Sequence, residues 1–350
     1  MRQRANGFDG LRLFAAGLVI WGHSYPLTGH VSPGILANSV QTIGVKIFFV
    51  VSGFLIMKSW QSDPNLWHFW SKRALRIMPG LVLICILTVL ILGPIFTSIT
   101  ISGYISNPLT LFYFWNLALY PVYFLPGVFA GNIYGPAING SLWSLPVEVA
   151  MYAGVPLVAW RSPALAKRLT LALALALLAA SIYFVRVYQP SPPPIIWGSN
   201  LVSALDAACY FYAGATFAAF NLDRFANLPV AIALFAAATI TVNGYASGEI
   251  ALALTLPYAA ISVGTISSSA LSFLKGRDYS YGLYLYGFPI EQAIVHLIGP
   301  QSAITNTMIA FPVALLLAVM SWVLVERRAL SFKPRRSSSK HQATRVTEYA

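Results

Sequence analysis

The chain has 350 residues, of which 57% are hydrophobic and only 9% are charged, and its formal net charge is +12. A water-soluble domain carries about 25% charged residues, so this composition excludes an ordinary soluble protein and indicates an integral membrane protein. The positive charge does not indicate nucleic-acid binding, because the Lys and Arg residues form short clusters between long apolar segments and no continuous basic face.

Ten apolar segments are each close to the roughly 20 residues that an α-helix needs to cross a bilayer. They predict an all-α integral membrane protein, a polytopic bundle of about ten transmembrane helices. The first segment is an uncleaved span, because no small-residue cleavage site follows it. The segments are 10–28, 40–59, 79–98, 142–160, 169–188, 200–220, 228–246, 250–271, 280–298 and 305–325.

The distribution of basic residues orients these spans, because Lys and Arg favour cytoplasmic loops. If segment 108–140 stays on the outer face without crossing, 20 of the 22 Lys and Arg residues fall on one side, and only Lys46 and Arg186 lie elsewhere. This arrangement predicts a non-crossing outer-face segment and cytoplasmic termini. The transmembrane domain then covers 1–328, and the basic tail 329–350 is predicted to be disordered beside the inner lipid headgroups.

The first span reads DGLRLFAAGLVIWGH and contains two polar residues eleven positions apart, Arg12 and His23. At about 100° per residue they share one helix face, with Arg12 at the cytoplasmic edge and His23 past the middle of the membrane. Asp9 lies three residues before Arg12 and is expected to pair with it. A lone arginine is often a topology anchor and a lone histidine a core residue, but their shared face indicates a polar interior.

Two more ionisable residues lie inside spans, where a charge is costly and indicates either a functional site or a buried ion pair. Lys46 lies about two turns from the outer edge of the second span, and Glu148 lies at a similar depth in SLWSLPVEVAMY. We therefore expect Lys46 and Glu148 to pair. Pro146 opens or kinks the helix beside Glu148, and Tyr152, one turn later, shares its face. Ser52 is a small residue of the kind that lets helices approach closely.

On the inner side, Arg73 and Arg76 are spaced to converge on one anion, and arginine suits bidentate contacts with phosphate. Cytoplasmic anchoring of a span produces the same pattern. Before and within the ninth span, four tyrosines including Tyr284 precede a buried Glu291, which indicates the wall of a pocket. A basic inner mouth suits a phosphorylated cytoplasmic donor, and a histidine farther out suits general-base activation of a hydroxyl.

Neither a P-loop nor the HExxH spacing of zinc enzymes occurs in the sequence. We therefore expect no metal and no bound cofactor. The features described so far also fit a transporter, because ten spans with buried charges suit a substrate pathway, although the sequence has no inverted repeat.

Six stretches occur in order along the chain: FDGLR followed ten residues later by a histidine, GVKIFFVVSGFLI, KRALRIMPG, SLWSLPVEVAMY, YSYGLYLYGFPI and WVLVERR. With these motifs the whole chain resembles the acyltransferase-3 family, bacterial membrane enzymes that acylate carbohydrates at the cell surface. The resemblance implies a bacterial inner-membrane enzyme that uses acyl-CoA, usually acetyl-CoA, as co-substrate and a glycan or glycolipid hydroxyl as acceptor. It leaves open an acyl-relay protein that passes the group to a separate periplasmic transferase.

The same resemblance implies roles for individual residues. Arg12 and His23 match the arginine–histidine pair of the family's first span, and Arg73 and Arg76 match its paired inner arginines, which are placed for the CoA phosphates. His23 is then the catalytic residue, either as the general base for the acceptor hydroxyl or as a transient carrier of the acyl group.

The resemblance also covers the middle of the site. Ser52 and Glu148 fall in the family's SGFL and SLxxE motifs, and Tyr152 closes the second motif. We expect Glu148, with Lys46 nearby, to orient the catalytic histidine or the sugar. Many family members have a histidine where this chain has Gly287, which implies a different acceptor pocket.

Overall fold

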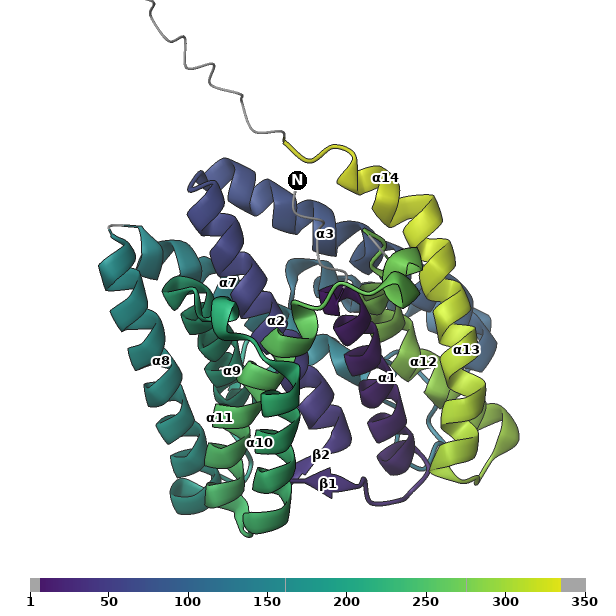
Figure 1. Cartoon of the computed structure of the whole chain (residues 1–350). Coiled ribbons are helices and arrows are strands. Elements are labelled where there is room, and N and C mark those ends of the chain that lie inside the picture. Colours follow the sequence, from purple (N-terminus) through teal and green to yellow (C-terminus); the bar gives the residue numbers. More distant parts are fainter. Residues whose placement is uncertain (1–6, 161, 275, 335–350) are drawn as a thin grey trace, which may run out of the picture.

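A computed structural model describes residues 7–160, 162–274 and 276–334, which form a bundle of helices (Figure 1). The chain is 76% helical, so the predicted all-α class is confirmed. The strands in the described residues are two short antiparallel pairs: β1 (Gly34–Ile35) with β2 (Asn38–Ser39), and β3 (Ile195–Ile196) with β4 (Ser199–Asn200). Most of the predicted tail, from residue 335 onward, lies outside the described residues, as do Arg2, Arg4, Arg161 and Lys275.

In the part of the chain that the structure describes, ten long helices build the bundle, and π-helical turns extend three of them. The long helices are α1 (Gly7–Leu27), α2 (Val40–Ser62), α3 (Leu66–Leu87), α7 (Ser144–Ala159), α8 (Pro163–Tyr183), α9 (Leu201–Phe220), α10 (Leu228–Thr241), α11 (Tyr245–Gly264), α12 (Tyr279–Ile298) and α13 (Ala303–Ser321). The π-helical turns are Thr88–Leu92, Phe184–Tyr188 and Trp322–Glu326, and the first and last lead into the short helices α4 (Gly93–Phe96) and α14 (Arg327–Leu330).

Among the described residues, seven helical segments are long and apolar enough to cross a membrane, as expected for a multi-pass membrane protein. They are Val40–Ser62, Leu66–Phe96, Gly140–Ala159, Pro163–Tyr183, Leu201–Phe220, Ala246–Gly264 and Ala303–Leu330. The predicted count of ten is not confirmed, although a helix lies at every predicted segment. The three others are α10, which has only 14 residues, and α1 and α12, which carry several polar side chains.

The predicted third span begins earlier than expected. α3 begins at Leu66, where the Asn65 side chain accepts a hydrogen bond from the His68 backbone N–H and caps the helix. The helix then continues through Pro79 to Phe96. The basic residues before Pro79 were expected to lie in a loop because they are polar. They lie instead on the first half of α3, which is capped by Asn65.

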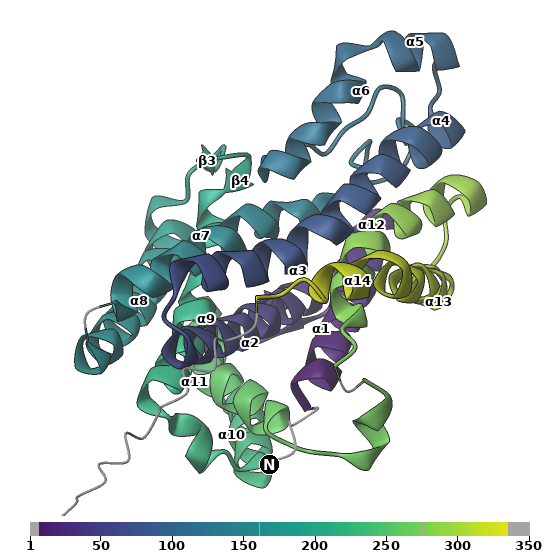
Figure 2. The ribbon, with the colours of Figure 1, turned by 90° about the horizontal axis from the view of Figure 1, so that it is seen from above.

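The segment between α4 and α7 contains no helix long enough to span a membrane in its described residues. Its helices are α5 (Ile101–Ser106), α6 (Pro108–Phe112) and the 3-10 turns Tyr113–Ala118 and Gly140–Trp143, and α5 and α6 lie together at the edge of the bundle in Figure 2. Ser98 donates to the Gly127 carbonyl, so the chain folds back on itself. This agrees with the predicted non-crossing segment.

Glycines allow the closest helix contacts. A Cβ on Gly53 of α2 would lie 1.9 Å from the Phe211 carbonyl oxygen of α9, and one on Gly287 of α12 would lie 2.7 Å from Ile20 of α1. A histidine at position 287 would therefore collide with α1. Glycine at this position allows α12 to pack directly against α1.

The bundle has two distinct ends. α1 and α2 run antiparallel, because Phe8 stacks on Phe54 while Gly22 lies against Gln41 at the other extreme. We call the end where α1 begins the arginine end, since it holds Arg12, and the opposite end the histidine end, since it holds His23. The arginine end lies at the top of Figure 1.

Candidate active site

A cavity of about 490 Å³ opens at the arginine end between α1, α2, α3, α7 and the start of α12. Six residues that the sequence predicts for the site line it. The full lining is Phe8, Asp9, Arg12, Ser52, Leu55, Ile56, Ser59, Lys72, Arg73, Arg76, Tyr152, Gly276, Asp278, Trp322, Leu330 and Lys333. Residues from distant parts of the sequence thus form a pocket with an excess of positive charge.

Two arginines of this cavity meet on one carboxylate. Arg12 Nη1 lies 2.5 Å from Asp278 Oδ2, and Arg76 donates to the same oxygen. The other oxygen, Asp278 Oδ1, accepts from the backbone N–H of Ser280, 3.1 Å away, and from its hydroxyl. Sequence reasoning missed Asp278. The signal was present in RDYSYG, because an Asp two residues before a Ser at the start of a helical segment is a typical N-cap.

The predicted pair between Asp9 and Arg12 is wrong. Asp9 accepts a long hydrogen bond of 3.4 Å from the backbone N–H of Gly276, and Arg12 pairs with Asp278 instead. The Asp278 side chain is only 8% exposed, so its interaction with Arg12 is screened less by solvent than a surface pair would be.

Arg73 occupies a different wall of the cavity from Arg76. Its Nη1 donates to the Phe69 carbonyl at 2.9 Å, and its guanidinium stacks 4.0 Å from the centre of the Phe69 ring. Arg73 and Arg76 therefore line one cavity without meeting on one anion in this state. Beside them, Lys72 donates to Asp63 at 2.7 Å, and this hydrogen bond lowers the pKa of Asp63 below its ordinary value.

Glu148 forms a compact group with two of its predicted neighbours. Glu148 Oε1 accepts from the Ser52 hydroxyl at 2.7 Å and from the Tyr152 hydroxyl at 2.6 Å. The predicted shared face of Glu148 and Tyr152 is thus confirmed. Pro146 lies in the first turn of α7, where its missing N–H removes no helical hydrogen bond.

The predicted pair between Lys46 and Glu148 is wrong. Lys46 Nζ lies 2.8 Å from Glu249 and 3.1 Å from Asp206, and it donates to the Asn38 side chain at 2.6 Å. These partners come from α11, α9 and strand β2. Glu148 lies beside Ser52, six residues farther along α2 than Lys46, and the side chain of Lys46 contacts α9 and α11 instead of α7.

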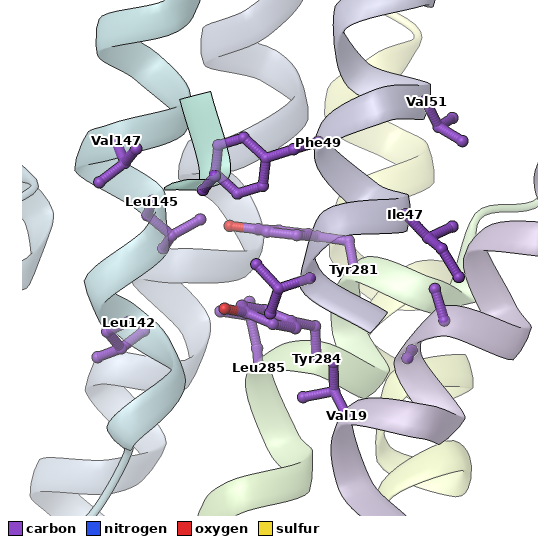
Figure 3. Packing of buried hydrophobic residues seen from close by; sticks show 14 of the residues in the cluster. Val19, Ile47, Phe49, Val51, Leu142, Leu145, Val147, Tyr281, Tyr284 and Leu285 are labelled. Atoms are coloured by element: carbon purple, nitrogen blue, oxygen red, sulfur yellow. The ribbon is translucent and has the colours of Figure 1, made fainter. Parts of the chain in front are cut away.

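A second, smaller cavity of about 40 Å³ lies deeper in the bundle. Its lining is Arg12, Val45, Phe48, Phe49, Ser144, Leu145, Glu148, Tyr281 and Tyr284. Figure 3 shows the rings of Tyr281 and Tyr284 reaching from α12 toward Leu145. The Tyr284 hydroxyl donates to the Ser141 carbonyl at 2.7 Å and lies 2.7 Å from the Ser144 hydroxyl. Arg12 lines both cavities, so the two are neighbours separated by this side chain, and we call the second one the inner cavity.

His23 lies at the other end of α1, about 16 Å farther along the helix axis. Its ring meets Phe288 edge-on, with 5.3 Å between centroids, and Phe288 also contacts Tyr134 of the segment before α7. His23 Nδ1 is buried without a hydrogen-bond partner in the described part of the chain. No hydrogen bond joins His23 to Glu148 among these residues, so the expected orientation of His23 by Glu148 is not seen.

Glu291 lies at the histidine end and does not line either cavity. It is fully buried, and its Oε1 accepts from the Ser24 hydroxyl at 2.7 Å. Ser24 in turn contacts Asn306 and Thr307 of α13. Of the four tyrosines and Glu291 that were predicted to form one pocket wall, Tyr284 therefore belongs to the inner cavity, whereas Glu291 belongs to a polar network next to His23.

Comparison with known proteins gives a consistent picture. A family model described as an acyltransferase domain matches residues 5–327. A protein named O-acetyl transferase from Shigella phage Sf6 is 30% identical over 94% of this chain and 97% of its own length. Nodulation protein 10 from Rhizobium leguminosarum bv. viciae is 26% identical over 94% of each chain. No solved structure shows a significant match to the chain.

Proposed function

Because the chain belongs to the acyltransferase-3 family, we propose that it is a membrane O-acyltransferase that uses acyl-CoA, with acetyl-CoA as the simplest donor. The acceptor is a hydroxyl of a glycan or glycolipid. The arginine end faces the cytoplasm of a bacterial inner membrane and binds the donor, and the histidine end faces outward. The relative named O-acetyl transferase supports transfer to oxygen.

The observation that carries this proposal is the position of the basic cavity relative to His23. Arg12, Arg73 and Arg76 line one cavity of about 490 Å³. We assign the phosphate groups of acyl-CoA to this cavity. A guanidinium offers several N–H donors in a planar fork that fits phosphate oxygens. His23 lies at the far end of the helix that carries Arg12. The positive charge that binds the donor (Arg12) and the base that activates the acceptor (His23) thus lie at opposite ends of one helix, α1.

The reaction is a displacement at the thioester carbonyl. The acceptor oxygen forms a new C–O bond to the acyl carbon while His23 takes the hydroxyl proton, and the C–S bond then breaks. The CoA thiolate that leaves takes up one proton, so the thioester and alcohol become an ester and a thiol. In a two-step route His23 attacks first and carries the acyl group before the acceptor oxygen takes it.

We place the path between the two ends along the inner cavity, which is lined by residues between Arg12 and the middle of α12. It runs past Arg12, Glu148 and Tyr284, so we assign these residues to the passage for the pantetheine arm. At about 40 Å³ this cavity is far smaller than the cavity of about 490 Å³ at the arginine end. The described conformation is therefore closed, and the side chains of Tyr281 and Tyr284 have to move before the thioester approaches His23.

Purified protein in lipid vesicles, supplied with labelled acetyl-CoA and a glycan acceptor, tests the proposal. We expect His23→Ala to lower acyl transfer by about 10²–10⁴-fold, the usual contribution of a general base, with unchanged thermal unfolding. His30→Ala is a matched control, because His30 lies in the loop after α1 and contacts Thr28. Full activity of a folded His23→Ala protein would overturn the role of His23.

The same vesicles separate the alternatives. A transporter would move its cargo while the thioester stays intact. An acyl-relay protein would cleave the thioester but deliver the acyl group to the outer side without attaching it to the acceptor.

A further inference from the structure

We propose that Asp278 is a positioning residue for the donor, which holds Arg12 and Arg76 together on the cavity wall and fixes this point to the start of α12. The inference rests on the proposed function, because it concerns how the same cavity recognises an anionic donor. Sequence reasoning assigned no role to Asp278.

The three residues meet from three separate elements. Arg12 lies on α1, Arg76 lies on α3, and Asp278 is the N-cap residue of α12. Both guanidinium groups donate to the same oxygen, Asp278 Oδ2. Two guanidinium groups this close repel one another. The carboxylate that they share offsets this repulsion and keeps Arg12 and Arg76 side by side.

Asp278 itself is held in place. Its second oxygen, Oδ1, accepts from the backbone N–H and the hydroxyl of Ser280, and this cap fixes the side chain to the first turn of α12. The side chain is 8% exposed. Because the carboxylate is nearly buried and is fixed by these hydrogen bonds, it forms a permanent part of the cavity wall. A mobile surface carboxylate, by contrast, would be displaced by an anionic ligand.

The arginines keep hydrogen-bonding capacity for a ligand. Each guanidinium has five N–H donors and needs only one for the contact with Asp278. Arg12 Nε is buried without a partner in the described residues. With two cations for one carboxylate, the cluster retains net positive charge, so a phosphate adds to the pair and the carboxylate stays in place.

α12 connects this point to the rest of the path. Tyr281 and Tyr284 of the same helix line the inner cavity, and Phe288, ten residues after Asp278, contacts His23. Because Asp278 fixes Arg12 and Arg76 to the start of α12, a donor bound by these arginines is held at a fixed distance along α12 from the inner cavity and from His23.

The test is Asp278→Asn in the vesicle assay, with CoA binding to the detergent-purified protein measured by calorimetry. Asparagine caps a helix about as well as aspartate, so the substitution removes the charge and keeps the cap. We expect the KM for acetyl-CoA and the Kd for CoA to rise by about 10-fold while kcat changes by less than about 3-fold. Asp223→Asn, a carboxylate removed at the same end but outside the cavity, should change neither constant.

A second measurement tests whether Asp278 acts through Arg76. The double variant Arg76→Gln, Asp278→Asn should bind CoA more weakly than Arg76→Gln alone by clearly less than the roughly 10-fold that Asp278→Asn costs the wild type, because one of the two positioned groups is already absent and only Arg12 is left to be held. Losses that multiply would overturn the mechanism. If Asp278→Asn does not fold, Ser280→Ala removes one hydrogen bond to Asp278 Oδ1 and should raise the Kd for CoA by about 2–3-fold, and an unchanged Kd would contradict the proposal.

The outcomes separate this inference from the proposed function. Wild-type protein that neither binds CoA nor cleaves acetyl-CoA would overturn the proposed function itself. Wild-type protein that binds CoA, together with an Asp278→Asn variant that binds it equally or more tightly, would overturn only the positioning role.

Discussion

Two ion clusters lie inside the same bundle and differ in their ratio of cations to carboxylates and in whether a cavity adjoins them. At the arginine end, two cations, Arg12 and Arg76, share the single carboxylate of Asp278 beside a cavity of about 490 Å³. Between α2, α9 and α11, one cation, Lys46, serves two carboxylates, Asp206 and Glu249. Lys46 is 1% exposed, and none of the cavities described above touches this second group.

The difference lies in how far each cluster satisfies itself. Lys46 also binds Asn38 and lies over the Tyr210 ring, and Glu249 accepts further bonds from Asn38 and Tyr210. A buried charge is tolerated only where it is paired and hydrogen-bonded. Here Lys46 and both carboxylates each have partners within the protein, although two carboxylates for one cation leave an excess of negative charge. The arginine-end cluster keeps surplus positive charge and free N–H donors. A saturated cluster holds helices together, whereas an unsaturated one beside a cavity recognises a ligand.

The sharpest test of this contrast is Lys46→Met. Removing one partner of a buried ion pair leaves uncompensated charge and costs about 3–5 kcal/mol, so we expect a large fall in the thermal unfolding temperature in detergent. Acyl transfer per folded molecule should stay close to that of the wild type. A variant with normal stability and lost activity would place the Lys46 cluster in the catalytic machinery and break the comparison.

Arg12→Lys examines the other cluster with a smaller expected effect. Lysine keeps the positive charge but loses the planar fork that serves Asp278 and a phosphate together. We expect the KM for acetyl-CoA to rise by about 10-fold, equivalent to about 1.4 kcal/mol, with little change in unfolding temperature. An unchanged KM would leave Arg12 as a membrane anchor without contact to the donor.

Local relationships could be predicted from the sequence. Apolar segments located every long helix, because hydrophobic length is a property of one stretch of chain. Glu148 and Tyr152 were placed on one face because they are four residues apart on a helix, and the structure joins them by a hydrogen bond. The spacing of Arg12 and His23 likewise follows from the geometry of a single helix.

Relationships between helices could not be predicted in the same way. Depth in the membrane suggested that Lys46 and Glu148 pair, but depth does not define the direction in which a side chain leaves its helix. Lys46 pairs with Glu249, which is 203 residues away in the sequence, and Arg12 pairs with Asp278, which is 266 residues away. Asp278 was missed because it lies in a polar turn next to a basic residue, where a carboxylate looks like part of a solvated loop.

The smallest expected effect comes from the pair between Lys58 and Asp223, which joins the end of α2 to the turn after α9. The two side chains are 32% and 31% exposed and lie 3.2 Å apart. An ion pair accessible to solvent contributes about 0–1 kcal/mol, so Asp223→Asn should shift the unfolding temperature only slightly and less still at high salt. Its activity should match that of the wild type. A large loss of stability would mean that accessible charge at this end also holds helices together, and burial and saturation would then no longer distinguish the two clusters.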